Sequence, residues 1–512
     1  MKHYTLVFDA TLIASGYHSG IYFVAYQMML ALLKEKKFRI SFYFDPKRVK
    51  PQQKHKLAET IQSLSPEAKV QFDIPAVEYS FWGHFMQGLS AQITMKPDKL
   101  SAGRIFLNPS LRIVRKIVSI LLKKGILPEY KEFTADAWVS PVFAPPSNLK
   151  YVSRKKNFIS LYDTIPVLFP ELHTLEWKNP VWWYARVLNT SAEDCIYFAI
   201  SESTKKLFLE KCPWLHAHQI TTTPLAADSK KFYVCDTCAI EKIRKKYAIP
   251  PHTRYMFSLA TLEERKNLLF IVETYLEFIQ EHRITDFYFL LAGGLYSSND
   301  PRQQKIYNTL VEYAKQYPTI RLLGYVPDED LAPLYSGADF FVYPSLFEGF
   351  GLPILEAMQC KTAVITNNCS SLPEVAGDSA VLLPPCDREA WKEQIRKFYS
   401  SKEERDTYAA KGLLRASQFS WERFQKLING TILDELKHIT RKSSKSPKKQ
   451  RPVMIFNATI LAEGFHSGLY NTAKNLLHEF IKADHFRIKL LFFPSNTQPQ
   501  IQSVIRHLPG KM

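Results

Sequence analysis

The stretch YPSLFEGFGLPILEAM, residues 343–358, indicates a strand end, a glycine-rich loop and a helix in immediate succession. An apolar run ends at Tyr343, a Pro-Ser turn follows, and Pro353 suits the first turn of a helix. In this arrangement the loop N–H groups and the positive end of the helix dipole can receive a phosphate group. Glu348 is predicted at the loop tip facing a cleft. Glu356 falls inside the helix, where its carboxylate can accept paired hydrogen bonds from ribose hydroxyls, although two solvated acids at a helix start are the plainer alternative.

The rest of the chain repeats the alternation of buried strand, Gly- or Pro-containing turn and amphipathic helix, which is typical of parallel α/β layers. With 512 residues, of which 46% are hydrophobic, the chain can fill more than one core. The predicted strands form two groups, separated by Pro250 and Pro251 after a basic helix at 240–247. They lie at 6–8, 40–44, 137–139, 157–161, 196–200, 255–259, 287–292, 320–323, 340–343 and 363–366.

We therefore predict an α/β protein with two Rossmann-like domains that face a cleft. The first spans residues 1–250 and the second spans residues 251–420. The segment 421–440 has helical spacing and is expected to be a closing helix. The tract RKSSKSPKKQR at 441–451 resembles a linker.

An internal repeat lies beyond the linker. Residues 6–46 match residues 454–494 without a gap, and His18 pairs with His466. We interpret residues 452–512 as the start of a second, incomplete module of the same kind, and the chain as a fragment of a tandem protein. The alternative is that this last segment folds onto the first module.

Charge and composition restrict the partners. Lys and Arg number 67 against 49 Asp and Glu, a formal net charge of +18, which favours nucleic acid, anionic lipid or phosphate-bearing substrates. Nucleic acid is disfavoured because no recognition motif is present. No apolar run approaches the length of about 18 residues that spans a membrane, and residues 1–9 resemble a strand rather than a signal peptide, so we expect a cytoplasmic protein. The seven cysteines have no framework spacing, and neither a metal nor a cofactor is expected.

The stretch at 343–358 resembles the E-x7-E signature of the retaining glycosyltransferase family 4, whose members have the GT-B fold. SLATLEERKN at 258–267 resembles the family segment whose basic residues hold the donor diphosphate, which assigns that role to Arg265 and Lys266. Similar matches to the donor-binding half occur at 290–294, 323–345 and 370–385. The resemblance covers roughly residues 1–440 and is strongest in the second half.

The residue types suit this chemistry. Departure of a nucleoside diphosphate builds negative charge, which fixed cations and a helix N-terminus stabilise. Arg265 can grip phosphate in a fork, whereas Lys266 supplies a point charge. Two adjacent basic residues in a loop are more often simply solvated. Their place directly after a strand favours the functional interpretation.

The first half contributes further candidates. The stretch 9–29 resembles the family's N-terminal glycine loop, with Gly16 and Gly20, near donor and acceptor; a plain turn is the alternative. LYDTIP at 161–166 resembles a His-Asp-x-x-Pro motif in which Tyr162 replaces the histidine. Acceptor-side candidates are therefore His18, Tyr162 and Asp163. In AISEST at 199–204, Ser201 or Ser203 caps a helix or binds a ligand.

By resemblance, catalysis is assigned to Glu348, Arg265, Lys266 and Asp163. The donor site is assigned to Gly16, Gly20, Arg265, Lys266, Gly349, Phe350, Gly351, Leu352 and Glu356.

A basic amphipathic helix is predicted at 110–126. Such helices lie on anionic membrane surfaces, and the alternative is an internal helix packed on the first sheet. A peripheral location on the inner face of the cytoplasmic membrane is therefore one expectation.

The resemblance implies a metal-independent enzyme that retains the anomeric configuration while moving a hexose to a glycan or polyprenyl-linked glycan. The sequences YDTIP at 162–166 and EGFGLPILEAM at 348–358 resemble those of family members that act in O-antigen and capsule synthesis. This resemblance favours mannose from GDP-mannose. Rhamnosyl, glucosyl or N-acetylglucosaminyl transfer from a dTDP- or UDP-sugar is the alternative within the class. A non-catalytic sugar- or phosphate-binding module of a tandem protein is the alternative from another class.

Overall fold

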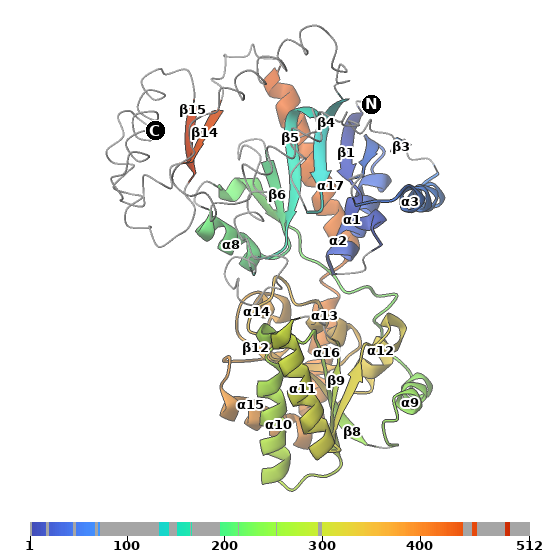
Figure 1. The fold of residues 1–512 in the computed structure, drawn as a ribbon, viewed down its shortest axis with the longest axis vertical. Helices are drawn as coiled ribbons and strands as arrows, with labels where there is room; N and C mark the ends of the chain where they lie inside the picture. Colours follow the sequence, from blue (N-terminus) through green and yellow to red (C-terminus); the bar gives the residue numbers. More distant parts are fainter. Residues whose placement is uncertain are drawn as a thin grey trace, which may run out of the picture.

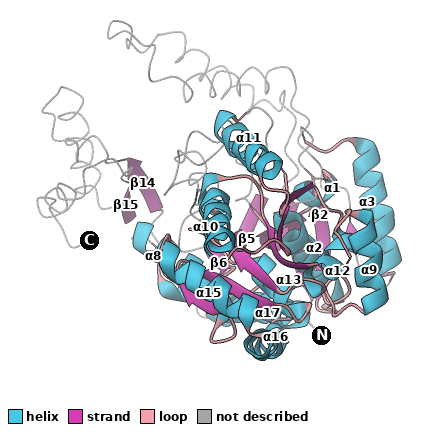
Figure 2. Cartoon of the chain, turned by 90° about the horizontal axis from the view of Figure 1, so that it is seen from below, coloured by secondary structure: helices cyan, strands magenta, loops and turns pink. Residues whose placement is uncertain are grey.

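The computed structural model describes residues 3–16, 20–44, 48–66, 70–71, 133–142, 151–163, 165, 195–212, 215–251, 253–294, 300–443, 453–457 and 487–491. These residues form two parallel sheets, one above the other in Figure 1, and a separate pair of strands. Continuous apolar runs form the strands because a parallel sheet is buried beneath helices. Figure 2, seen from below, shows helices around the strands of the two superposed sheets.

The first domain is built on a seven-stranded sheet in the order β3-β2-β1-β4-β5-β6-β7, with every pair of neighbours parallel. The core includes fully buried Phe8, Trp138 and Phe158. The strands are β1 (Tyr4–Asp9), β2 (Phe38–Tyr43), β3 (Val70–Gln71), β4 (Phe133–Ser140), β5 (Tyr151–Leu161), β6 (Cys195–Ala199) and β7 (Ile220–Thr222). The helices are α1 (Thr11–Ala14), α2 (Gly20–Lys34), α3 (Pro51–Leu64) and α8 (Glu202–Lys211), with the short η5 (Ala217–Gln219).

The second domain is built on a six-stranded parallel sheet in the order β10-β9-β8-β11-β12-β13. The strands are β8 (Arg254–Leu259), β9 (Phe287–Ala292), β10 (Ile320–Gly324), β11 (Phe340–Tyr343), β12 (Ala363–Asn367) and β13 (Val381–Leu383). The helices are α9 (Thr237–Lys246), η6 (Glu264–Lys266), α10 (Leu268–Glu281), α11 (Pro301–Gln316), α12 (Asp328–Ser336), α13 (Leu352–Gln359), α14 (Leu372–Ala376), α15 (Arg388–Ser400) and α16 (Lys402–Ala416).

The last long helix returns to the first domain. Helix α17 (Trp421–Ser443) lies beside α2 and β5, and Figure 1 shows it in orange within the upper domain. Its apolar face buries Ile428, Ile432 and Leu436 completely. The Asn429 side-chain amide donates to the carbonyl of Ala31 at 2.7 Å. The predicted closing helix therefore completes the first domain after the chain has passed through the second.

The predicted strands of both groups are all present, and the predicted fold of two Rossmann-like sheets is confirmed. The short strands β3, β7 and β13 were not predicted, because two or three residues carry too little apolar periodicity.

The structure differs from the predicted boundary at residue 250. Helix α9 packs against α12 of the second domain, where Lys246 forms an ion pair with Asp330 and the Tyr247 hydroxyl donates to Asp330 at 2.7 Å. The second domain therefore begins before Thr237. Sequence alone suggested otherwise because Pro250 and Pro251 look like a hinge, whereas they form the turn between α9 and β8.

Later in the chain, β14 (Val453–Asn457) and β15 (Arg487–Leu491) pair in parallel, at positions that the repeat matches to the predicted strands at 6–8 and 40–44. Their interpretation as the start of an incomplete second module stays a prediction. The amphipathic helix predicted at 110–126 lies outside the described residues. Within the described ranges, no helix combines the length and the apolar character that crossing a membrane requires.

The packing of α17 gives a first prediction. Ile432→Ala should destabilise the protein by about 2–4 kcal/mol, because it removes fully buried methyl and methylene groups and leaves a cavity. Lys426→Ala, on the exposed side of the same helix, is the matched control. Urea unfolding followed by circular dichroism measures both variants. Equal midpoints for the two would contradict the assignment of α17 to the core of the first domain.

Candidate functional site

The candidate site lies at the carboxyl ends of the strands of the second sheet. The loop after β8 carries Arg265 and Lys266 in the short helix η6, and the loop after β11 carries Glu348. The two loops are joined directly, since the Leu346 N–H donates to the Arg265 carbonyl at 2.7 Å. In open α/β sheets the crevice outside the carboxyl ends of the strands is where ligands bind.

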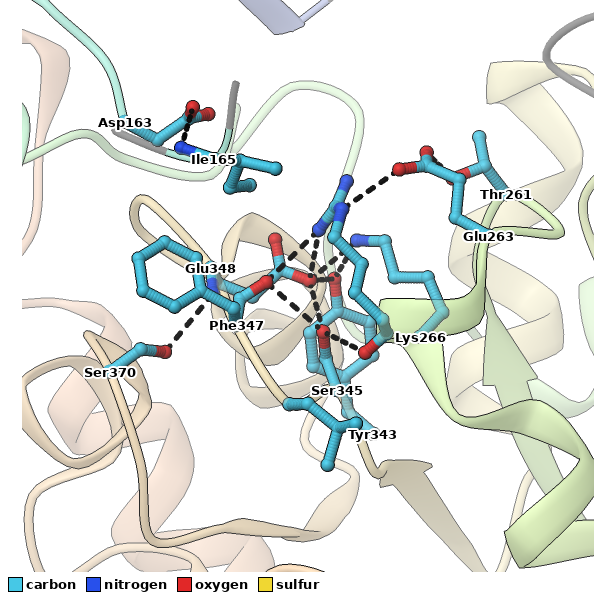
Figure 3. A network of polar contacts seen from close by, with 12 residues as sticks. Asp163, Ile165, Thr261, Glu263, Lys266, Tyr343, Ser345, Phe347, Glu348 and Ser370 are labelled. Atoms are coloured by element: carbon cyan, nitrogen blue, oxygen red, sulfur yellow. Dashed lines mark hydrogen bonds and ion pairs between the residues drawn. The ribbon is translucent and has the colours of Figure 1, made fainter. Parts of the chain in front are cut away.

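The carboxylate of Glu348 is the centre of a polar cluster (Figure 3). Its Oε1 accepts from Lys266 Nζ at 2.6 Å and from Arg265 Nη1 at 3.0 Å. The same oxygen accepts from the Tyr343 hydroxyl at 2.8 Å and from Ser345 Oγ at 2.6 Å. One carboxylate is thus the shared counterion of two adjacent cations.

Burial and charge set the ionisation of this cluster. Burial by itself would raise the pKa of Glu348, but Lys266 and Arg265 together lower the pKa to about 2. Burial likewise opposes the charge of Arg265, yet Glu348 and Glu263 raise the pKa of its guanidinium. Burial lowers the pKa of Lys266, and Glu348 counteracts the shift. Glu348 and Arg265 are therefore both charged at neutral pH.

The glycine loop between Glu348 and α13 is tightly held. Gly351 has φ 107° and precedes α13, which begins at Leu352. A Cβ added at Gly349 would lie 2.7 Å from the carbonyl oxygen of Tyr162 in the first domain. A residue with a side chain at position 349 would therefore force the domains apart, which explains the glycine there. Phe350 is buried against the edge of Phe419.

Glu356 lies one turn into α13 in a separate environment. Its Oε2 accepts from the Tyr335 hydroxyl at 3.0 Å. Burial raises the pKa of Glu356 to about 7, and the Tyr335 hydrogen bond only partly opposes this shift. Glu348 and Glu356 thus have opposite pKa shifts, because two cations contact Glu348 directly, whereas burial outweighs the influence of Lys231 on Glu356.

The first domain presents Asp163 to this cluster. In Figure 3, Asp163 lies beside Ile165, on the far side of Glu348 from Tyr343 and Ser345. Its Oδ1 accepts from the N–H of Ile165 at 3.1 Å. Burial raises its pKa, and Arg265 opposes the shift. The neighbouring Tyr162 side chain is buried, and burial raises the pKa of its hydroxyl.

Direct hydrogen bonds join the two domains beside the site. Ser201 Oγ donates to the carbonyl of Gly349 at 2.7 Å, and Thr204 Oγ1 lies within hydrogen-bond distance of the same carbonyl at 3.1 Å. Within the first domain, Thr204 Oγ1 also donates to the carbonyl of Tyr162 at 2.9 Å. Ser201 is also the N-cap of α8, since its Oγ accepts from the Thr204 N–H at 2.9 Å. Of the two candidate capping residues, Ser201 is the cap.

The predicted site residues are therefore brought together only in part. Glu348, Arg265, Lys266 and Asp163 lie in one region, with Glu356 on the adjoining helix. Gly16 has φ 73° and follows α1, whereas Gly20 begins α2. Among the residues that the structure describes, no contact places these two glycines on the cluster, so their role in donor binding stays a prediction. His18 lies outside the described residues.

Sequence reasoning missed several partners of Glu348. Tyr343 and Ser345 stand within the quoted stretch, but there they mark a strand end and a turn rather than a polar site. Ser370 Oγ accepts from the Glu348 N–H at 3.0 Å. Ser370 opens the stretch 370–385, which resembles the family's donor-binding half, although the sequence alone assigned no role to this serine.

Among the described residues, no three or more His, Cys, Asp and Glu side chains are grouped as a metal site. The cysteines in that part of the chain are free.

Known proteins share this architecture. HepE from Anabaena, solved in complex with UDP-glucose, matches with a TM-score of 0.54 at 15% identity, covering 84% of this chain and 100% of that one. Residues 239–415 match the glycosyl transferases group 1. The O-antigen chain mannosyltransferase B of Escherichia coli is 32% identical over 297 residues, which are 58% of this chain and 73% of that protein. The serotype-specific mannosyltransferase WbdA of Escherichia coli is 28% identical over 262 residues, 51% of this chain and 31% of that protein.

Two parallel sheets with a cluster of charged residues at their junction, together with these matches, thus define a glycosyltransferase of the GT-B fold. The chain belongs to the group 1 glycosyl transferases. The family resemblance predicted from the motifs at 258–267 and 343–358 is confirmed. WbdA is matched over about a third of its length, so that relative carries less weight than the first.

The shared counterion gives a second prediction. Glu348→Ala should destabilise the protein by about 3 kcal/mol, because it leaves two largely buried cations without their common anion. Glu312→Ala is the control, since it breaks an exposed pair with Lys315 and should change stability by at most about 0.5 kcal/mol. Urea unfolding at pH 7 compares them. A Glu348→Ala protein as stable as the control would show that the cluster is solvated.

The raised pKa of Glu356 gives a third prediction. In the folded state Glu356 keeps its proton up to a pKa of about 7, whereas in the unfolded state it loses the proton near pH 4.5. The stability that this difference contributes is therefore fully present below about pH 4.5 and is lost as the pH rises towards 7. Relative to Glu356→Gln, the wild type should therefore lose about 2–3 kcal/mol of stability between pH 5 and pH 8. Urea unfolding of both proteins at the two pH values measures this difference. Parallel pH profiles would contradict it.

Proposed function

We propose that this enzyme transfers a hexose, with retention of configuration, from a nucleoside diphosphate donor to a glycan or polyprenyl-linked glycan acceptor. The observation that carries the proposal is the pairing of Arg265 and Lys266 at the carboxyl edge of the second sheet, next to the N-terminus of α13. Such a set of fixed positive charges is what a departing diphosphate requires.

The donor diphosphate would bind between the two cations and the glycine loop. Arg265 supplies a guanidinium fork for two phosphate oxygens and Lys266 a point charge. The N–H groups at Gly351 and Leu352 add the positive end of the α13 dipole. Glu348 holds both cations in place before the donor arrives, so that little reorganisation is needed when charge develops on the leaving group.

Glu356 would bind the ribose of the donor. Its carboxyl group lies in the first half of α13, one helix turn beyond the residues proposed for the diphosphate. The Tyr335 hydroxyl donates a hydrogen bond to Glu356 Oε2 and thereby fixes the orientation of the carboxyl group. A carboxyl group with one oxygen so held can accept hydrogen bonds from vicinal hydroxyls.

The acceptor would enter from the first domain, past Asp163. Asp163 is buried close enough to Arg265 for that cation to lower its pKa, and the Ile165 N–H donates to Asp163 Oδ1 and so fixes the orientation of the carboxylate. In this proposal Asp163 orients the acceptor hydroxyl. Attack occurs on the face that the diphosphate leaves, so a leaving phosphate oxygen takes the acceptor proton, and no enzyme nucleophile, metal or cofactor takes part.

We propose GDP-mannose as the donor, because the chain is similar to the O-antigen chain mannosyltransferase B and because its sequence motifs resemble those of mannosyltransferases. UDP-glucose in HepE keeps UDP-sugars as the alternative. The mannosyltransferase B of Escherichia coli also supports a role in the synthesis of an O-antigen-type polysaccharide, and we propose the cytoplasmic face of a membrane as its location. The net charge of +18 suits a peripheral position on an anionic surface.

The fourth prediction tests this function. Arg265→Ala and Lys266→Ala should each lower transfer on the order of a hundredfold, because both contacts act on charge that develops in the transition state. Lys402→Ala, whose side chain is 81% exposed, is the control and should be unaffected. Rates are measured with GDP-mannose, dTDP-rhamnose, UDP-glucose and UDP-N-acetylglucosamine.

The outcomes separate the alternatives. Release of one nucleoside diphosphate in preference to the others identifies the donor. Near-normal turnover in both alanine variants would remove Arg265 and Lys266 from the diphosphate site. Binding of a nucleotide sugar without release of any nucleoside diphosphate would favour the non-catalytic module instead.

A further inference from the structure

An acidic side chain of the second domain is bound to a helix N-terminus of the first. Glu374, in α14, accepts through Oε1 from the Glu202 N–H at 2.9 Å and through Oε2 from the Ser203 N–H at 3.1 Å. The first N–H groups of a helix have no partner within the helix, and the helix dipole favours a negative charge there. Both oxygens of Glu374 are therefore used to hold α8.

The same turn of α8 holds both sides of the candidate site. Ser201 donates to the carbonyl of Gly349, which directly follows Glu348 in the chain. Thr204 donates to the carbonyl of Tyr162, which directly precedes Asp163. The first turn of α8 thus fixes the backbone next to both carboxylates, one from each domain.

Glu374 is itself held rigidly by its own domain. Arg415, in α16, donates through Nη2 to the Glu374 carbonyl at 2.6 Å and through Nε to the Val375 carbonyl at 3.0 Å. Gly377 ends α14 with φ 58°, and a Cβ added there would lie 3.3 Å from the Arg415 side chain. The backbone that carries the Glu374 carboxylate is therefore held in a fixed position opposite α8.

We propose that Glu374 is a positioning residue for glycosyl transfer. By binding the N-terminus of α8, Glu374 fixes the position of the first domain relative to the second. It thereby fixes the distance from Asp163 to the donor site around Glu348. It makes no contact with Glu348, Arg265, Lys266 or Glu356 in the described residues, so it acts on the acceptor side rather than on donor affinity. The inference rests on the proposed function, and it extends that function to a residue outside the cluster.

The contact itself is tested without any activity assay. In Glu374→Ala, the amides at the start of α8 should exchange with deuterium about tenfold faster, because they lose their acceptors. Glu374→Gln keeps one acceptor oxygen and should fall between wild type and Glu374→Ala. Glu403→Ala is the matched control: Glu403 is an exposed acid in the first turn of α16 of the same domain. Unchanged exchange at 202–203 in Glu374→Ala would overturn the proposal.

The positioning role is tested by separating binding from transfer. Glu374→Ala should lower the kcat of transfer tenfold or more, since small displacements of reacting groups reduce rates steeply. Its affinity for GDP and UDP, measured by calorimetry, and its melting temperature should match those of Glu403→Ala. Glu374→Gln should restore part of the rate.

Each other result has a definite meaning. Transfer within twofold of wild type in Glu374→Ala would overturn the positioning role, as would a parallel loss of nucleotide affinity or stability. If wild type itself transfers no sugar from any nucleotide donor, the proposed function fails, and the positioning role fails with it. The exchange experiment then still decides whether Glu374 holds α8.

Discussion

The ion pairing of Glu348 with Arg265 and Lys266 is the interaction on which the rest of the site depends. Adjacent cations that are largely removed from water repel each other and need an anion to remain charged. Glu348 supplies that anion from a different loop and so ties the end of β8 to the end of β11. The glycine loop, the start of α13 and the carbonyl of Gly349 then have fixed positions. Through that carbonyl the first domain is placed as well.

The sequence alone predicted the elements more completely than their partners. Strands such as Phe287–Ala292 are continuous apolar runs, and burial on both faces of a parallel sheet is the direct physical cause of that pattern. Glu348, Glu356, Arg265 and Lys266 were predicted because each stands at a fixed spacing within a short motif. Helix periodicity, in contrast, shows that a helix has an apolar face but not what covers that face. The domain of α9 and the return of α17 were therefore not legible.

The contacts between the domains were also beyond sequence reasoning. Ser201 and Gly349, like Glu374 and the amides of α8, are distant in the chain and meet only because both sheets present their loops to the same gap. The absence of a side chain at Gly349 matters as much as any polar group, since it allows the carbonyl of Tyr162 to approach. The need for a glycine that lets another backbone approach produces no periodic pattern in the sequence. A glycine in a loop motif is therefore easily interpreted as a phosphate contact alone.

The return of α17 to the first domain has a consequence for how the chain acquires its structure during synthesis. The first domain is discontinuous, because its core includes residues near the N-terminus and residues such as Leu436. A ribosome releases these parts at widely separated times, and the whole second domain emerges between them. The second domain can thus be the first to reach its native state, although domains usually fold in the order of their emergence. Until α17 emerges, the apolar face of α2 that it covers needs protection from other chains.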